Sequence, residues 1–336
     1  MTTMEVAQIT DGNASASSTI NKFYFRAIVL VLGVIGTAAN GLVIYALVAS
    51  KQHKVYMLIF NQNVLDLFSS VFLIITYAVK ISNLRLTGLL GYWVCVLLLS
   101  EKVIWLGIIG SVINLACVTV ERYLRVVHPA WSKKKLNDWV IYSAAAFAWI
   151  ASLIYNAAVV FPTTGVTAGT CQKYSIWENE TSKLILFIWK FLSFYVIILL
   201  IFVFCYWRIL HVVRRQAQVM AGHDAGSGSE KINKMQVSVI KTMILVSAFY
   251  AVSWLPTYIY LLLVNLDPDL HIIEVGYYTA EFISWMYICT NPFIYASKFE
   301  PVKKILLGLI PCIKISAQQS GNAASSGTRN LTTRNV

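Results

Sequence analysis

Long apolar runs separated by short polar segments cover most of the chain. Seven runs are long enough to cross a bilayer as helices, which takes about 20 apolar residues: 23–50, 56–79, 93–120, 139–161, 184–209, 242–264 and 275–296. None shows the period of two that marks a barrel strand, and only helices or closed barrels satisfy the backbone in lipid. The pattern predicts an all-α membrane protein built as a seven-transmembrane helix bundle.

The segments outside the spans define the remaining organisation. Residues 1–22 are polar and predict an extracellular N-terminal tail before the seven-transmembrane receptor domain of residues 23–298. Residues 313–336 are polar and rich in hydroxyl groups, which is typical of a disordered cytoplasmic tail.

Residues 299–312 have an amphipathic helical pattern. Val302 and Ile305 share one face, while Lys303 and Lys304 occupy another. This pattern predicts a short helix lying on the inner membrane surface. Cys312 follows it and is a candidate for palmitoylation.

Composition agrees with a bilayer environment and sets the orientation. The chain is 58% hydrophobic and 12% charged, which excludes a soluble domain of this length. Most of its 27 Lys and Arg residues fall on one side if the N-terminus is outside, and the positive-inside rule then places the C-terminus in the cytoplasm. Anionic lipid headgroups account for the net charge of +12, so no nucleic-acid partner is expected.

Glycosylation sequons and cysteines fit this orientation. Asn13 and Asn179 begin sequons on the outer side and are expected to carry glycans, whereas Asn330 lies inside and should not. Cys95 and Cys171 are the cysteines predicted to lie outside the membrane core in the oxidising compartment. A disulfide between them would join the top of the third span to the loop after the fourth.

Several short motifs occur in a fixed order along the spans, and together they resemble those of the rhodopsin-like (class A) G-protein-coupled receptors. They are "GTAANGLVIY" with Asn40, "NQNVLDL" with Asp66, "ERY" (Glu121, Arg122, Tyr123), Trp149, "SWLP" with Trp254 and Pro256, and "NPFIY" with Asn291, Pro292 and Tyr295. The resemblance implies a plasma-membrane receptor that binds an extracellular ligand and activates a heterotrimeric G protein. Receptor kinase and arrestin are further implied partners.

The resemblance also implies how the switch works. Glu121 would hold Arg122 by a charge-assisted bond in the idle state, and the released Arg122 would contact the G protein and the inward-facing Tyr295. Prolines inside the sixth and seventh spans permit kinks, and Trp254 would form the floor of the outer cavity. The full set implied for coupling and activation is Glu121, Arg122, Tyr123, Tyr206, Trp254, Pro256, Asn291, Pro292 and Tyr295.

A buried carboxylate must be paired, protonated or bound to a cation. By the same resemblance, Asp66, Ser111 and Asn291 would hold a sodium ion with water. No other metal or cofactor is expected.

Three positions depart from the family pattern. Ile198 stands where the fifth span usually has a proline, and Gln236 stands where many members carry an acid that binds the arginine, so the idle state would depend on Glu121. Cys95 lies farther from Arg122 than expected, which leaves equivalences at the top of the third span uncertain by about half a helical turn.

Ligand class is narrowed by exclusion. Amine receptors need an acid in the outer third of the third span, where counting gives Ile104 or Lys102, with Glu101 close by. An opsin needs a lysine in the seventh span, where Trp285 occupies the expected place. A peptide, a lipid or a small acidic or zwitterionic molecule remains.

Lys190 is the strongest candidate for binding an acidic ligand group. It lies about two turns below the outer end of the fifth span, and Glu281 in the seventh span should face the same cavity. Two other interpretations stay open: Lys190 snorkels to the interface, or it forms an internal pair with Glu281 or Glu101.

Two other functional classes compete with a receptor. Charged groups inside spans also occur in transporters and channels, but the chain shows no inverted repeat. An enzyme is not expected, because the sequence has no nucleophile elbow, P-loop, metal-ligand motif or pair of catalytic carboxylates.

Overall fold

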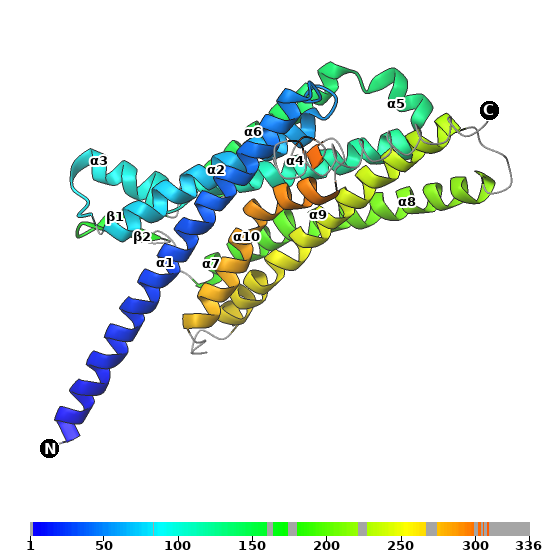
Figure 1. Cartoon of the computed structure of the whole chain (residues 1–336). Coiled ribbons are helices and arrows are strands. Elements are labelled where there is room, and N and C mark those ends of the chain that lie inside the picture. The colour runs from blue at the N-terminus through cyan, green and yellow to red at the C-terminus, as the bar shows by residue number, and fades with distance from the viewer. Residues whose placement is uncertain are drawn as a thin grey trace, which may run out of the picture.

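The computed structural model describes residues 3–82, 84–159, 164–173, 180–220, 227–266 and 274–298, together with positions 302, 303, 305 and 308. Long helices run side by side in one elongated bundle (Figure 1). They are α1 (Thr3–Ala49), α2 (Met57–Ser82), α3 (Gly88–Trp93), α4 (Lys102–Val127), α5 (Pro129–Lys135), α6 (Asp138–Val159), α7 (Glu180–Lys190), α8 (Ile197–Met220), α9 (Ser227–Leu266) and α10 (Glu274–Lys298). Two π-helical segments, η1 (Val94–Leu99) and η3 (Phe191–Val196), interrupt the third and fifth spans.

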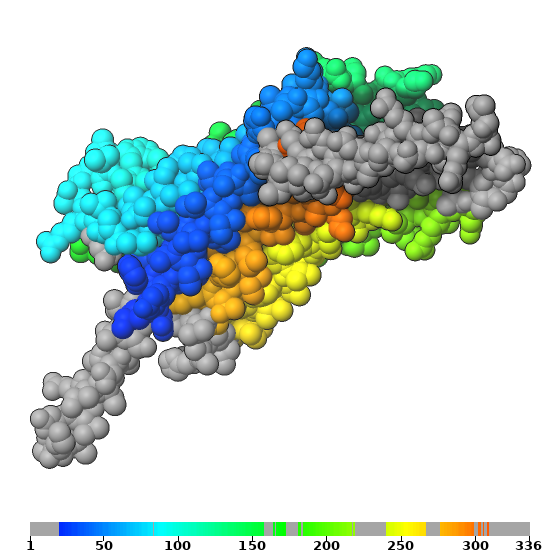
Figure 2. Space-filling model, in the orientation of Figure 1, coloured from blue at the N-terminus to red at the C-terminus, as the bar shows by residue number. Residues whose placement is uncertain are grey.

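Six stretches of the described residues are long and apolar enough to cross a bilayer: Ile20–Ala49, Met57–Ser82, Gly88–Val127, Asp138–Ala157, Leu184–Gln216 and Ile240–Leu266. The seventh predicted span is α10, which has 25 residues and packs against α1, α2 and α9. Figure 2 shows α1 (blue), α10 (orange) and α9 (yellow) next to one another on one face. Polar residues such as Glu281 and Asn291 make α10 less apolar than the others.

The distribution of side chains suits a lipid environment. Leu200, Val203 and Trp207 of α8 are each more than 60% exposed. Completely buried positions, in contrast, include polar residues: Asn40, Asp66, Ser111, Asn114 and Asn291. Apolar groups outside and hydrogen-bonded polar groups between helices are the arrangement expected where lipid replaces water.

The third span is not one continuous helix. It was predicted over residues 93–120, but α3, η1 and α4 form it together, with a break at Ser100 and Glu101. Glu101 has a left-handed backbone with φ of 63°. A π-helical turn contains more residues than an α-helical turn, so η1 and the break absorb the extra length between Cys95 and Arg122.

A short hairpin follows α6. Strands β1 (Thr164–Thr167) and β2 (Thr170–Lys173) pair antiparallel, and Ala168 and Gly169 both have positive φ in the two-residue turn, as a type I′ turn requires. Cys171 of β2 forms a disulfide with Cys95 of η1, which confirms the predicted bond. The hairpin is therefore tied to the outer end of the third span.

The first helix differs from its predicted bounds. It begins at Thr3 instead of residue 23, so the segment expected as an N-terminal tail continues the helix. Residues 3–22 contain no proline, and nothing in their backbone forces the helix to end before the first span.

Candidate functional site

A cavity of about 300 Å³ lies between the outer parts of α4, η3, α9 and α10. Aromatic rings form much of its wall. The ring centroid of Trp254 lies 5.1 Å from that of Phe194 and 5.5 Å from that of Trp105, and Trp105 in turn lies 6.1 Å from Trp285. Trp254, the predicted floor, lines this cavity and is 2% exposed.

Four of the residues predicted to contact the ligand besides Trp254 line the same cavity: Glu101, Lys190, Glu281 and Trp285. They come from the start of the third span's main helix, from α7 and from α10. Lys190 therefore faces the bundle interior. Snorkelling would instead place its ammonium group at the lipid interface. Glu101 forms an ion pair with Lys80 of α2, so its carboxylate is already engaged by another lysine.

Lys102 and Ile104 do not fit the predicted positions. Both are buried, at 2% and 0% exposure, and neither is among the described residues that line the two outer cavities. Trp105 and Ile109 line the cavity instead. The break at Glu101 shifts the helical register, so the count from Cys95 that gave Lys102 cannot identify the inward face. The count from Arg122 that gave Ile104 stays within α4 and differs by one residue from Trp105, which lines the cavity.

Two buried hydrogen-bond donors line this cavity. The indole Nε1 atoms of Trp254 and Trp285 are buried and have no hydrogen-bond partner among the described residues. A buried donor without a partner costs about 1 to 3 kcal/mol. An acceptor oxygen entering the cavity would remove this cost.

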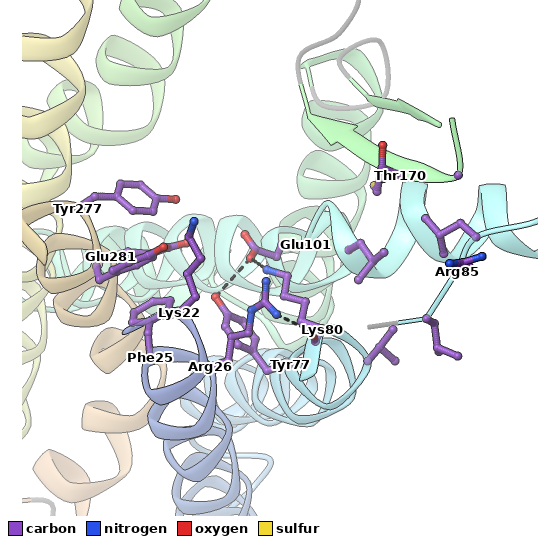
Figure 3. Close-up of a pocket in the computed structure, with 17 residues that line it drawn as sticks. Lys22, Phe25, Arg26, Tyr77, Lys80, Arg85, Glu101, Thr170, Tyr277 and Glu281 are labelled. Atoms are coloured by element: carbon purple, nitrogen blue, oxygen red, sulfur yellow. Dashed lines mark hydrogen bonds and ion pairs between the residues drawn. The ribbon is translucent and has the colours of Figure 1, made fainter. Parts of the chain in front are cut away.

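A second cavity of about 610 Å³ lies beside the first, and Glu101, Tyr277 and Glu281 line both. Figure 3 shows Lys22 of α1 and Glu281 of α10 pointing toward one another across it. Lys80 reaches Glu101 from α2, and Tyr77 donates a hydrogen bond of 3.3 Å to the same carboxylate oxygen.

The walls of this second cavity carry more positive than negative charge. Its basic lining residues are Lys22, Arg26, Lys80 and Arg85, and its acidic ones are Glu101 and Glu281. The guanidinium of Arg26 donates to the carbonyl oxygen of Lys80 over 2.7 Å, which fixes one of the cations at the junction of α1 and α2.

Below the cavities, the predicted sodium-site residues lie in a buried polar network. Asn291 Nδ2 donates to Asp66 Oδ2 over 2.8 Å, and the hydroxyls of Ser111 and Tyr287 lie 3.2 Å apart. Asp66 Oδ1 and Asn291 Oδ1 are buried without a hydrogen-bond partner among the described residues. Two such oxygens fit a small cation.

Part of this network was not predicted from the sequence. Gln62 donates to Ser111 Oγ and accepts a 2.8 Å hydrogen bond from Asn114 Nδ2, while Asn61 receives a 3.0 Å bond from Trp149 Nε1. Polar residues in an apolar span were the available signal. Gln62 lies within the quoted motif "NQNVLDL", but only Asp66 of that motif was assigned a role.

At the cytoplasmic end, the residues of the predicted switch form two groups. Arg122 Nε lies 3.0 Å from Glu121 Oε2 in the last two turns of α4. The Tyr206 hydroxyl of α8 lies 3.0 Å from both Thr119 Oγ1 of α4 and Ser247 Oγ of α9. Arg122 near Glu121 matches the arrangement expected of the idle state.

The remaining switch residues lie in α9 and α10 and at the end of α4. Tyr295 is 1% exposed, and Pro256 and Pro292 lie inside α9 and α10 respectively. The Tyr123 hydroxyl lies 3.3 Å from His128 Nε2.

Some predicted sites lie outside the described residues. These are Asn179, Cys312 and Asn330, and for Asn13 and Gln236 only the helical backbone is described. Position 302 and its described neighbours are helical, but the predicted membrane-surface helix of residues 299–312 is otherwise outside the described part of the chain.

The known proteins that this chain resembles are receptors. The model of the family "7 transmembrane receptor (rhodopsin family)" matches residues 39–295. C-C chemokine receptor type 8 of Mus musculus is 25% identical over 302 residues, which cover 84% of this chain and 78% of that protein. Galanin receptor type 1 of Rattus norvegicus is 23% identical over 307 residues, which cover 88% of this chain and 84% of that protein.

A solved structure shares the fold. The crystal structure of squid rhodopsin superposes with a TM-score of 0.71 at 19% identity and covers 87% of this chain and 86% of that chain. The predicted seven-helix membrane fold is confirmed, and the alternative of a transporter or channel is set aside. The chain belongs to the rhodopsin family of seven-transmembrane receptors.

Proposed function

We propose that this receptor binds an extracellular peptide through an acidic group in the 300 Å³ cavity and activates a heterotrimeric G protein. The observation that carries the ligand class is the set of donors on the cavity wall. Lys190 supplies an ammonium group, and Trp254 and Trp285 each supply an indole N–H that has no partner among the described residues. A carboxylate is the group that such a set of donors binds best.

The relatives support a peptide in place of a lipid or a small zwitterion. They are named as receptors for C-C chemokines and for galanin, which are polypeptides. The two adjoining cavities, of about 300 and 610 Å³, give room for several residues of an extended chain. The excess of basic groups on the walls of the second cavity also favours an acidic ligand.

The bonds around Trp254 suggest how binding reaches the cytoplasm. Pro256 interrupts the hydrogen bonds of α9, and the Thr257 hydroxyl donates to the carbonyl oxygen of Ala280 in α10 over 2.9 Å. A ligand that displaces Trp254 would bend α9 at this proline. The inner half of α9 would then pull Ser247 from Tyr206, and Arg122 would leave Glu121 for the G protein.

Other parts of the proposal follow from the family and the charge pattern. The N-terminus is outside and the C-terminus cytoplasmic, with receptor kinase, arrestin and membrane lipid as further partners. Asp66, Ser111 and Asn291 would bind a sodium ion, and the cation would supply a positive charge to the two oxygens that have no hydrogen bond.

A potency comparison tests the ligand class. Cells expressing the receptor and a promiscuous G-protein reporter are screened with acidic peptides and their amide analogues. Lys190→Met keeps the side-chain length and removes the charge, so the potency of an active acidic peptide should fall at least tenfold, about 1.4 kcal/mol. Lys190→Arg should keep most of the potency, and the amide analogue should lose little on Lys190→Met.

The same experiment can overturn the proposal. Equal potency of the acidic peptide on wild type and Lys190→Met, at equal surface expression, would assign Lys190 a structural role. Potency that falls equally for the acid and the amide would show that Lys190 shapes the cavity without binding the acidic group.

A further inference from the structure

Glu121 is shared by two guanidinium groups. Its Oε1 accepts a hydrogen bond from Arg125 Nε, and its Oε2 lies 3.0 Å from Arg122 Nε. The Glu121 side chain is only 7% exposed, while that of Arg125 is 45% exposed. Two arginines therefore compete for one buried carboxylate.

The contact with Arg125 has the better geometry. Residues four apart face one another on a helix, whereas adjacent residues do not. Accordingly, Arg122 Nε and Glu121 Oε2 are within ion-pair distance, but neither makes an aligned hydrogen bond with any described residue. Arg125 also lies in the last turn of α4, where the helix dipole favours a cation.

Arg122 has a second contact that does not depend on Glu121. Its Cζ lies 5.9 Å from the ring centroid of Tyr56, just before α2 begins, which is within the range of a cation–π interaction. Both residues line a cytoplasmic cavity of about 140 Å³, together with Glu121 and Arg125. The contacts that hold Arg122 in its idle position thus include a poorly aligned ion pair with Glu121 and the ring of Tyr56.

We infer that Arg125 is a positioning residue that keeps Glu121 paired when Arg122 leaves it, and so raises ligand-independent signalling. This inference rests on the proposed coupling to a G protein. Without Arg125, release of Arg122 would leave the buried carboxylate without a cation, which is strongly unfavourable. With Arg125 in place, the carboxylate stays neutralised in both states, and Arg122 is released more easily.

Nucleotide exchange without added ligand tests this inference. Membranes containing the full-length receptor are mixed with purified heterotrimeric G proteins, and the rate of GTPγS binding is measured per receptor. Arg125→Gln should lower the basal rate about fivefold, which corresponds to about 1 kcal/mol. Arg125→Lys keeps the charge and should retain most of the rate, and Lys134→Gln, an exposed lysine of α5, should keep the wild-type rate.

A double mutant separates action through Glu121 from direct contact with the G protein. Glu121→Gln should raise the basal rate, and adding Arg125→Gln in that background should change it little. An equal loss from Arg125→Gln in both backgrounds would overturn the inference, because Arg125 would then contact the G protein itself.

Two further outcomes are decisive. A wild-type rate no higher than that of Arg122→Ala would refute this inference, because there would be no ligand-independent signalling for Arg125 to raise, while the proposed coupling would fail only if an active acidic peptide also left exchange at that baseline. A wild-type rate above that baseline, with an unchanged or higher rate for Arg125→Gln, would refute the inference alone.

Discussion

Gly107 marks a close approach of α4 to α2. A methyl group on its Cα would lie 2.1 Å from Ser69 Oγ, and 3.0 Å from both the carbonyl oxygen of Leu65 and a ring carbon of Phe68. Ser69 donates a hydrogen bond of 3.0 Å to the Leu65 carbonyl, so turning its hydroxyl away would lose that bond. The Leu65 carbonyl belongs to the α2 backbone, and even alanine would therefore push the two helices apart.

The energy of this change can be worked out with a matched glycine. Overpacking costs about 1 to 3 kcal/mol, and the three short contacts at Gly107 place it in the upper part of that range. Replacing glycine by alanine inside a helix gains about 1 kcal/mol. Gly107→Ala should therefore destabilise the receptor by about 1 to 2 kcal/mol. Gly41→Ala, where nothing lies within 4 Å of the added methyl, should show the gain alone.

Thermal unfolding in detergent measures the difference. The buried thiols of Cys205 and Cys289 become accessible to a fluorescent reagent as the bundle opens. Gly41→Ala should melt at or above the wild-type temperature and Gly107→Ala below it, and Ser69→Ala should partly restore Gly107→Ala by removing the shortest contact. A Gly107→Ala receptor that melts with or above Gly41→Ala would refute the close approach of α2 and α4.

Three further outcomes are expected. Arg122→Ala should reach the cell surface but fail to stimulate nucleotide exchange, and normal exchange would place the coupling site elsewhere. Cys171→Ser should lower the melting temperature, as a reducing agent does to the wild type, because the disulfide closes a loop with a sequence separation of 76 and contributes up to about 4 kcal/mol. A Cys171→Ser receptor that melts at the wild-type temperature would contradict this. Glycosidase mapping should find glycans on Asn13 and Asn179, and a glycan on Asn330 would reverse the proposed orientation.

Spacing along single helices could be predicted from the sequence. The spans follow from the length of apolar runs. Glu281 and Trp285 line one cavity because both lie within the continuous helix α10, and Lys190 reaches the same cavity from the last residue of α7, just before η3. The pairing of Glu121 with Arg125 was not predicted, although "ERYLR" places the two residues four apart, a spacing that favours such a pair.

Register across a break in a helix could not be predicted. Periodicity assumes 3.6 residues per turn, but η1 and the left-handed Glu101 interrupt that period between Cys95 and α4. Neither feature has a local sequence signal, because glutamate rarely adopts positive φ. The ion pair with Lys80 holds Glu101 from another helix, so the break depends on tertiary contacts.

The π-helical segment η3 in the fifth span likewise depends on tertiary contacts. The usual proline is replaced by Ile198, yet the helix is still distorted over Phe191–Val196, which ends two residues before it. The Tyr250 hydroxyl of α9 donates to the carbonyl oxygen of Phe194, and the Tyr195 hydroxyl of η3 donates to that of Ala251 over 2.9 Å. Two reciprocal bonds between the spans thus replace a local residue as the support for the distortion. They join the fifth and sixth spans one turn from Trp254, so any movement of α9 at Pro256 must also carry η3 or break these bonds.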